Sequence, residues 1–169
     1  YEPIFAEMKA RTVIAGLPDG TYRFSDYLEG VSGEEMIFLN ASMTISGDSA
    51  EIDFAGSDPQ VQGALNFTVG ELSHPFLCLA LTNYIQTLEP DIPMNGGMIR
   101  PITTRAPKGT IMNAELPAAM GNRWVTAMRI YDVVLGCLAQ AIPGGLAAAG
   151  AAQAGIVSVA SRDRATGMR

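Results

Sequence analysis

The segment Ile37-Phe-Leu-Asn-Ala-Ser-Met-Thr-Ile45 decides the fold, because its odd positions are apolar and most of its even positions are polar. A period of two is typical of a strand with one buried face. Ser46-Gly-Asp-Ser49 follows with residues that tolerate positive φ, and the alternation resumes at Ile52 and Phe54. The pattern predicts an antiparallel hairpin in which Asp53 points away from the Ile52/Phe54 face.

Helical patterns lie on both sides of this hairpin. Residues 1–15 carry apolar side chains at helical spacing and predict a helix, which ends at the glycine- and proline-containing run 16–20. Residues 21–27 predict a short strand. Downstream, Ser73 is expected to cap a helix that ends at Pro90.

A third helical pattern near the end of the chain is the clearest of all. Its large apolar residues recur at intervals of four and three, along one stripe of about five turns. These residues are Trp124, Met128, Tyr131, Leu135, Leu138 and Ile142. We interpret the stripe as core, and a stripe that lines a ligand cavity is the rarer alternative.

Residues 98–104 and 110–114 flank a Pro-Lys-Gly turn and predict a second hairpin, with Pro101 forcing the first run to an edge or a bulge. Residues 146–155 form either a helix or a loop, and residues 156–160 resemble a strand with no partner downstream. The predicted fold is α+β, with antiparallel hairpins packed against two long amphipathic helices. We interpret residues 1–169 as a single segment from the middle of a larger subunit.

Composition excludes several classes of partner. The net charge is −6, and the two lysines, Lys9 and Lys108, form no basic stripe for nucleic acid. No run reaches the roughly 18 apolar residues of a membrane helix. Cys78 and Cys137 lie in apolar helical runs, which favours small buried hydrophobes over a disulfide. We expect a cytoplasmic location and neither a nucleic-acid nor a membrane partner.

Three asparagines lie in stretches where acids, amides, glycines and prolines alternate with short apolar runs. Asn66, Asn95 and Asn113 each carry a donor and an acceptor without charge, which suits the C=O and N–H of a cyclic amide. Asparagine also often bonds its own neighbouring backbone, so a local role stays open for each.

Charged candidates are few. Arg123, at the start of the third helix, suits a ligand carboxylate, whereas Arg129 is assigned to the solvated flank of that helix. Asp53 and Asp58 form either an acid pair or the charged ends of a turn. His74 is the only histidine, so this segment cannot build a two-histidine metal site, and an exposed or capping role is expected for it. No phosphate-binding loop occurs, so we expect neither ATP nor a metal to bind this segment.

Several short motifs occur in an order and spacing that resemble the hydantoinase B/oxoprolinase family. That family includes N-methylhydantoinase B, 5-oxoprolinase and the acetone and acetophenone carboxylase type of subunit. The motifs include Leu17-Pro-Asp-Gly-Thr-Tyr22, Ile52-Asp-Phe-Ala-Gly-Ser57, Gly63-Ala-Leu-Asn66, Ile92-Pro-Met-Asn-Gly96, Pro107-Lys-Gly-Thr110, Leu116-Pro-Ala-Ala119 and Arg129-Ile-Tyr-Asp132.

The resemblance implies that the complete protein is an ATP-dependent hydrolase of a cyclic amide such as a hydantoin, 5-oxoproline or a lactam. An ATP-binding, hydantoinase A-like subunit would be its partner, with Mg and a further divalent metal held outside residues 1–169. The segment itself is expected to be inactive and to supply scaffold and part of a substrate pocket. Its expected substrate-binding residues are Asn66, Asn95, Asn113, Arg123 and Asp53, and no catalytic residue is assigned.

Two alternatives remain. One is a segment of an ATP-dependent ketone carboxylase of the acetone or acetophenone type. The other is a non-catalytic module for assembly with the ATP-binding subunit, based on apolar residues such as Met94, Met98 and Met120.

Overall fold

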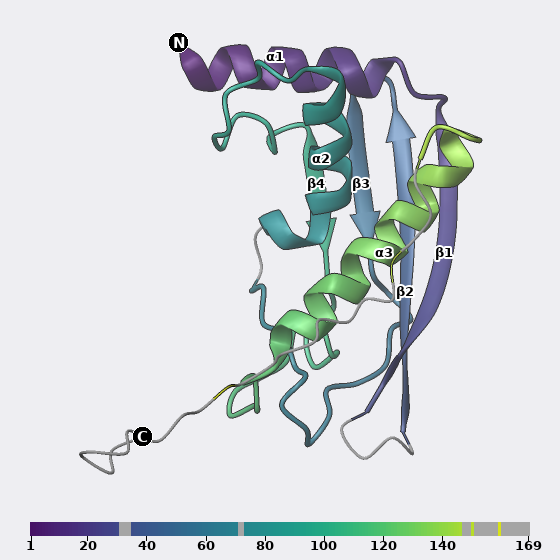
Figure 1. The fold of residues 1–169 in the computed structure, drawn as a ribbon, viewed down its shortest axis with the longest axis vertical. Coiled ribbons are helices and arrows are strands. Elements are labelled where there is room, and N and C mark those ends of the chain that lie inside the picture. Colours follow the sequence, from purple (N-terminus) through teal and green to yellow (C-terminus); the bar gives the residue numbers. More distant parts are fainter. Residues whose placement is uncertain (31–34, 71–72, 147–149, 151–158, 160–169) are drawn as a thin grey trace.

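The computed structural model describes residues 1–30, 35–70, 73–146, 150 and 159. Within them, one sheet of four strands in the order β1-β2-β3-β4 is accompanied by the helices α1, α2 and α3 (Figure 1). Helix α1 crosses one end of the sheet, and α2 and α3 lie on one of its faces. The predicted α+β class is confirmed, while the expectations for residues 146–155 and 156–160 fall almost wholly outside the described residues.

The hairpin expected around residue 47 is present. β2 (Met36–Ser46) pairs antiparallel with β3 (Ser49–Asp53), with Ser46 opposite Ser49. The loop therefore has two residues, and Gly47 takes a φ of 58° that favours glycine. β1 (Gly20–Glu29) pairs antiparallel with β2 and extends the short strand predicted at 21–27.

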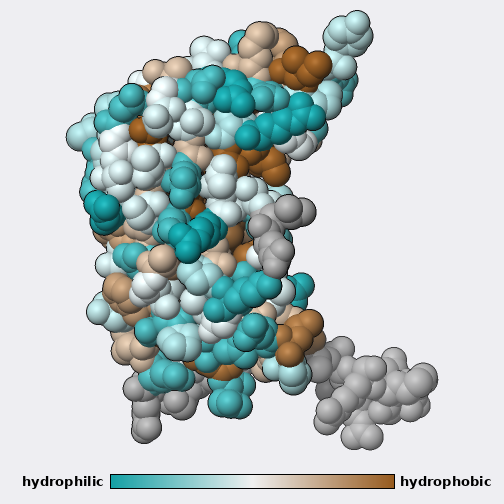
Figure 2. All heavy atoms as spheres, turned by 180° about the vertical axis from the view of Figure 1, so that it is seen from behind, coloured by the Kyte–Doolittle hydropathy of each residue, from teal (hydrophilic) through white to brown (hydrophobic). Residues whose placement is uncertain are grey.

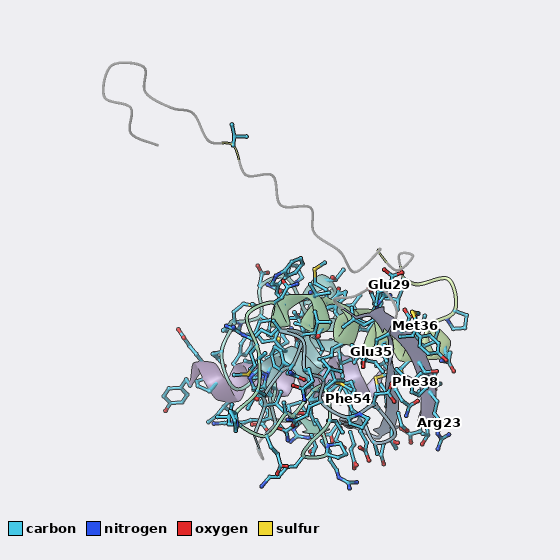
Figure 3. The ribbon with its side chains drawn as sticks, turned by 90° about the horizontal axis from the view of Figure 1, so that it is seen from below. Arg23, Glu29, Glu35, Met36, Phe38 and Phe54 are labelled. Atoms are coloured by element: carbon cyan, nitrogen blue, oxygen red, sulfur yellow. The ribbon has the colours of Figure 1, made fainter. Side chains whose placement is uncertain are left out.

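The alternation in β2 separates a core face from a polar face. Thr21, Thr44, Glu51 and Thr103 lie in register across the four strands on the polar face. From behind, this side of the molecule is mainly hydrophilic or neutral (Figure 2). From below, Phe54 lies near the middle of the molecule and Arg23 at its edge (Figure 3), in agreement with their buried and exposed side chains.

β4 (Ile102–Arg105) is an edge strand, but the second predicted hairpin is wrong. β4 pairs parallel with β3, which requires a long crossover. The 3₁₀ helix η1 (Pro75–Cys78) and α2 (Leu79–Leu88) form part of that crossover. The segment 110–114 bonds instead to the chain that follows β3, with Ile111 N–H donating to the Asp58 carbonyl.

Ser73 does not cap the crossover helix, which corrects the expectation from sequence. Its hydroxyl accepts a hydrogen bond from the Thr104 amide over 3.1 Å. His74 precedes η1 instead, and its side chain accepts a hydrogen bond from the Phe76 amide. The cap therefore lies one residue later, and Ser73 ties the start of the crossover to β4.

Helix α3 (Arg123–Ala141) confirms the third helical pattern, but the predicted stripe is core only in part. The residues that pack deepest on the sheet side are Ile130, Val133, Val134 and Cys137. Met128 keeps 39% of its surface exposed, and Trp124 and Tyr131 are partly buried. From Tyr131 onward the stripe packs against the core, and Leu138 lies within it, whereas Trp124 and Met128 do not.

Helix α1 (Glu2–Ala15) buries small residues, Ala6 and Ala10, while Ile4 and Met8 remain exposed. The short side chains let α1 pack closely on α2 and β3. The ion pair between Lys9 and Glu89, at 2.8 Å, adds a bridge from α1 to the end of α2. Among the described residues, no helix combines the length and apolarity needed to cross a bilayer.

Candidate functional site

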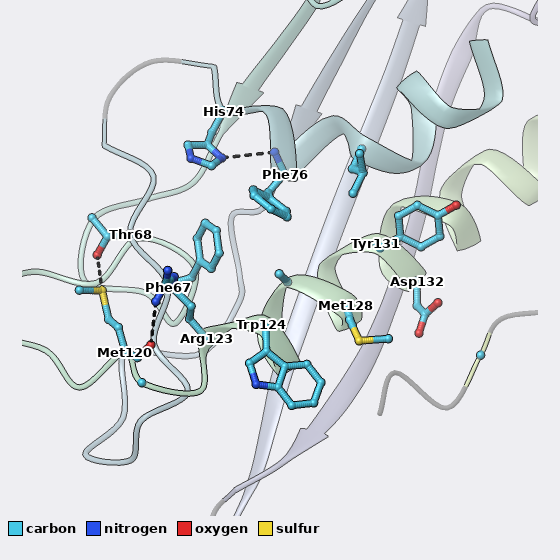
Figure 4. A pocket seen from close by; sticks show the side chains of 14 residues that line it. Phe67, Thr68, His74, Phe76, Met120, Arg123, Trp124, Met128, Tyr131 and Asp132 are labelled. Atoms are coloured by element: carbon cyan, nitrogen blue, oxygen red, sulfur yellow. Dashed lines mark hydrogen bonds between the residues drawn. The ribbon is translucent and has the colours of Figure 1, made fainter. Parts of the chain in front are cut away.

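A cavity of about 1030 Å³ lies beside the first half of α3. Its walls come from the loop at 67–68, the start of the crossover, the loop at 120–121 and the exposed flank of α3 (Figure 4). The described side chains that shape it most are Phe67, His74, Phe76, Met120, Arg123, Trp124, Met128, Tyr131 and Asp132. Most of this surface is apolar, with a few polar groups, which is the usual make-up of a small-molecule site.

An aromatic cluster forms one wall. The rings of Phe67 and His74 meet edge to face at 5.6 Å, and those of Phe67 and Phe76 at 5.8 Å. His74 and Phe76 stack at 5.9 Å. These contacts fix the imidazole between two rings at the edge of the cavity.

The hydrogen bond at His74 also fixes which ring nitrogen carries the proton. Its Nδ1 accepts from the Phe76 amide over 3.3 Å, so the neutral ring bears its hydrogen on Nε2. Burial lowers the pKa of His74, which favours this neutral form. His74 therefore lines the cavity as a neutral ring whose N–H donor is Nε2.

Asp132 is the most unusual polar group of the cavity. The residue is only 6% exposed, and its buried Oδ2 has no hydrogen-bond partner in the described part of the chain. The Arg129 guanidinium lies 3.7 Å away, but it also bonds Asp26 at 2.6 Å. Burial raises the pKa of Asp132, while Arg129 and a hydrogen bond from the Gly150 backbone oppose that rise.

Sequence reasoning missed Asp132 as a site residue and placed Arg129 wrongly. The Arg129 side chain is largely buried, and its ion pair with Asp26 links α3 to β1. A signal for Asp132 was present, because the motif Arg129-Ile-Tyr-Asp132 places an acid one residue after the aromatic Tyr131 of the stripe.

Of the five expected substrate-binding residues, Arg123 alone has a side chain that lines the main cavity. It is exposed at the start of α3, and its Nη1 makes a long hydrogen bond of 3.4 Å to the Met120 carbonyl. A guanidinium with this weak contact among the described residues keeps donors for an anionic ligand group.

Asn66 and Asn113 are buried and already bonded within the chain. Asn66 accepts from the Val61 amide and donates to the carbonyls of Val61, Gly63 and Ala119. It thereby fastens the loop before Phe67 to the loop before α3.

Asn113 accepts from the amides of Val69 and Gly70 and donates to the Gly70 and Ala106 carbonyls. It holds the loop that follows the cavity residues Phe67 and Thr68. As the chain folds, Asn66 and Asn113 position cavity walls, and direct contact of either amide with substrate stays a prediction.

Asn95 and Asp53 lie away from the cavity lining and also have local partners. The Asn95 carbonyl oxygen accepts from the Gly97 amide at 2.8 Å. Asp53 accepts from the Ala55 amide and pairs with Arg105 at 3.1 Å. Their predicted contact with substrate is likewise untested.

Asp58 accepts from the Phe38 amide at 2.7 Å, so Asp53 and Asp58 each hold a turn through separate partners. The turn alternative therefore accounts for the bonds of both carboxylates.

The described residues do not fit a metal ion. No group of three or more His, Cys, Asp or Glu side chains among them is arranged to hold one. Cys78 and Cys137 are buried free thiols, and burial raises the pKa of each to about 11. Both therefore remain protonated near neutral pH, as expected for small buried hydrophobes.

Known proteins with similar sequences carry hydantoinase and oxoprolinase names. The chain is 29% identical over 147 residues to a D-/L-hydantoinase component from Pseudomonas sp. (strain NS671), covering 82% of this chain and 25% of that protein. It is 32% identical over 120 residues to 5-oxoprolinase 1 of Arabidopsis thaliana, covering 68% of this chain and 9% of that protein.

Two solved structures share its fold. The ATP-dependent caprolactamase from Pseudomonas jessenii aligns with a TM-score of 0.68 and 26% identity, over 83% of this chain and 24% of that one. A nucleotide-free acetone carboxylase aligns with a TM-score of 0.65 at 20% identity, over 83% and 19% of the two chains, and shows the fold alone. The chain thus spans a quarter or less of the length of these relatives.

The similarity extends over nearly all of the sequence. The profile of the hydantoinase B/oxoprolinase family matches residues 5–169. This range includes the strands, the crossover and the cavity-lining half of α3. The chain belongs to the hydantoinase B/oxoprolinase family.

Proposed function

We propose that the protein containing these residues opens a cyclic amide in an ATP-dependent reaction, and that residues 1–169 supply scaffold and part of the substrate pocket. The observation that carries this proposal is the cavity beside α3, with its apolar walls and its polar groups of complementary kind. Hydantoins, 5-oxoproline and caprolactam share one chemical feature, an amide within a ring. The names of the relatives therefore agree on a substrate class even where their substrates differ.

Two polar groups at opposite ends of the cavity suit the two sides of such an amide (Figure 4). His74 has an N–H donor suited to the carbonyl oxygen and Asp132 an acceptor suited to the ring N–H, so one bound ring would contact one of them at a time. The rings of Phe67, Phe76 and Trp124 supply apolar surface for the methylene groups. We assign His74 and Asp132 to the binding and orientation of substrate, and no proton transfer is assigned to either.

The overall reaction consumes two waters and one ATP per ring opened, because both the ring amide and ATP are hydrolysed. It yields ADP, phosphate and the opened ring, which is an amino acid from a lactam or 5-oxoproline and an N-carbamoyl amino acid from a hydantoin. We propose that an ATP-binding, hydantoinase A-like subunit provides the nucleotide site, and that Mg and a further metal are held outside this segment. The roles given to His74 and Asp132 involve neither metal, because the described residues contain no fitting set of ligands.

The test uses the full-length subunit together with its ATP-binding partner. Hydantoin, 5-oxoproline and ε-caprolactam are each incubated with ATP, and the release of phosphate and of the ring-opened amino acid is measured. We expect ATP-dependent opening of at least one ring. Turnover of acetone and bicarbonate, with no ring opened, would instead support the ketone carboxylase alternative.

A variant pair then addresses the cavity. His74→Ala removes one donor to the carbonyl oxygen, so we expect KM to rise about tenfold, which corresponds to about 1.4 kcal/mol for one hydrogen bond. Thr87→Ala, on the exposed side of α2, is the matched control and should leave KM unchanged. Equal KM values for the two variants would show that His74 does not contact the substrate.

The assembly alternative loses part of its basis. Met98 is buried in the core, and Met120 lines the cavity, so of the three methionines that motivated it Met94 alone is strongly exposed, at 73%. A single exposed side chain is normal for a protein surface.

A further inference from the structure

We propose that the cavity also binds the ring-opened product, with the ammonium group of an ω-amino acid on Asp132 and its carboxylate on Arg123. This inference rests on the proposed function and deepens it, because it assigns both ends of the ligand and predicts a preferred length. The sequence predicted the carboxylate end at Arg123, whereas the ammonium end at Asp132 comes from the structure.

The charge balance around Asp132 is the first observation. Two carboxylates, Asp26 and Asp132, face one guanidinium, that of Arg129, and Asp26 holds it at the shorter distance. Asp132 therefore contacts this cation only at 3.7 Å, and its Oδ2 is buried without a hydrogen bond among the described residues. A buried carboxylate oxygen without a donor costs free energy, and a cationic N–H group in the cavity would supply the missing bond.

The wall next to Asp132 fits such a cation. Trp124, Met128 and Tyr131 line the cavity along the same helix (Figure 4). Aromatic faces attract an ammonium group, and the thioether of Met128 adapts to apolar chains of varied shape. The same surface would therefore accept the ammonium end and the methylene chain of one ligand.

The helix fixes where the other charge must lie. Arg123 and Asp132 are nine positions apart, which is about 13 Å along the axis and about half a turn in angle. They therefore border the stripe of Trp124, Met128 and Tyr131 from opposite sides and opposite ends. In the structure the Arg123 guanidinium bonds the Met120 carbonyl, away from Asp132 (Figure 4), and this exposed side chain would have to swing along the helix to shorten the span. The geometry therefore favours a ligand whose charges are separated by several methylene groups over a shorter one.

The test measures binding of four compounds to the full-length subunit in complex with its partner, by calorimetry or ligand-observed NMR. The compounds are 6-aminohexanoate, the shorter 4-aminobutanoate, hexylamine with only the ammonium, and hexanoate with only the carboxylate. We expect 6-aminohexanoate to bind more tightly than the other three. Equal or tighter binding of 4-aminobutanoate would overturn the length preference.

Two variants separate the ends of the ligand. Asp132→Asn should weaken 6-aminohexanoate and hexylamine about tenfold or more, the effect of about 1.4 kcal/mol, and leave hexanoate unchanged. Arg123→Gln should weaken 6-aminohexanoate and hexanoate by a similar factor and leave hexylamine unchanged. The controls Asp91→Asn and Arg23→Gln alter exposed groups outside the cavity and should bind all four compounds as the wild type does.

Binding of 6-aminohexanoate that is unchanged in Asp132→Asn and in Arg123→Gln overturns the proposal. If Asp132→Asn lowers the melting temperature too far for binding experiments, the exposed Arg123 still provides the test. Arg123→Gln should then bind hexanoate more weakly than the wild type and hexylamine equally well. Ring opening by the wild-type complex is measured separately. If the complex opens a lactam but the variants do not alter product binding, this inference is refuted and the proposed function stands. If the variants alter product binding but no ring is opened, the proposed function is refuted and this inference stands.

Discussion

Replacing Asn66 with alanine tests whether this residue holds the cavity wall or reads the substrate. Asn66 is fully buried, and its side chain makes four hydrogen bonds to the backbone, between 2.7 and 3.1 Å long. The substitution leaves one amide and three carbonyls without these partners. Two loops that flank the cavity, at 61–66 and at 119, then lose their common link.

The size of the effect follows from these bonds. A net value of about 1 kcal/mol for each would give about 4 kcal/mol, but Nδ2 has two hydrogens for three carbonyls, and water can enter to some of them, so we expect about 3 kcal/mol. This lies at the upper end of single-residue effects. Where the loops open locally, amide hydrogen exchange in them should speed up by about two to three orders of magnitude.

Hydrogen exchange monitored by mass spectrometry on the full-length subunit is the assay. Asn95→Ala is the matched control, because Asn95 is partly exposed and its side chain makes one bond, to the Gly97 amide. The control should change exchange little, by an effect below about 1 kcal/mol. The structural role of Asn66 is refuted if Asn66→Ala exchanges as slowly as Asn95→Ala while KM for the cyclic amide rises, since Asn66 would then contact substrate.

Three further predictions concern packing and protonation. Gly136→Ala puts a Cβ within 2.4 Å of the Phe24 ring, so urea unfolding should show a loss of about 1–3 kcal/mol that Phe24→Ala partly relieves. Gly97→Ala puts a Cβ 1.9 Å from the Pro3 carbonyl, so α1 should be displaced and limited proteolysis should cut it faster than in Gly96→Ala, where the added Cβ meets open space. Burial lowers the pKa of His74 below 6.5, so the unfolded chain binds the proton more readily than the folded one, and the free energy of unfolding should fall as pH drops through and below that value. In urea unfolding at several pH values, His74→Gln should reduce this dependence of the unfolding free energy on pH. An unchanged dependence would contradict the assignment to His74.

The strands that sequence identified best are those whose partners lie nearby along the chain. The alternation of residues 37–45 and the Gly47 turn involve neighbours only, so the pattern is sufficient to predict the hairpin. β4 is different, because its register with β3 depends on a parallel crossover of some fifty residues. Local turn chemistry at Pro107 and Gly109 was correct, yet it could not reveal that residues 110–114 bond to the loop after β3.

Periodicity predicted α3 but not the face it buries. Two apolar stripes run along this helix, and the sheet selects the one with Ile130, Val133 and Cys137. Gly136 permits close approach to Phe24 on that side. The larger residues Trp124 and Met128 consequently line the cavity, a choice that depends on the shape of the sheet and not on the helix alone.

The charge arrangement at Asp132 connects the fold with the proposed chemistry. A cyclic amide can offer this carboxylate only a neutral N–H, whereas the amine released by C–N cleavage can carry a full positive charge. The Asp132 carboxylate, which Arg129 contacts only at 3.7 Å, would therefore favour the opened ring more than the closed one. Interactions that strengthen as the bond breaks lower the barrier to breaking it, so a binding site for the product ammonium would also assist the ring opening itself.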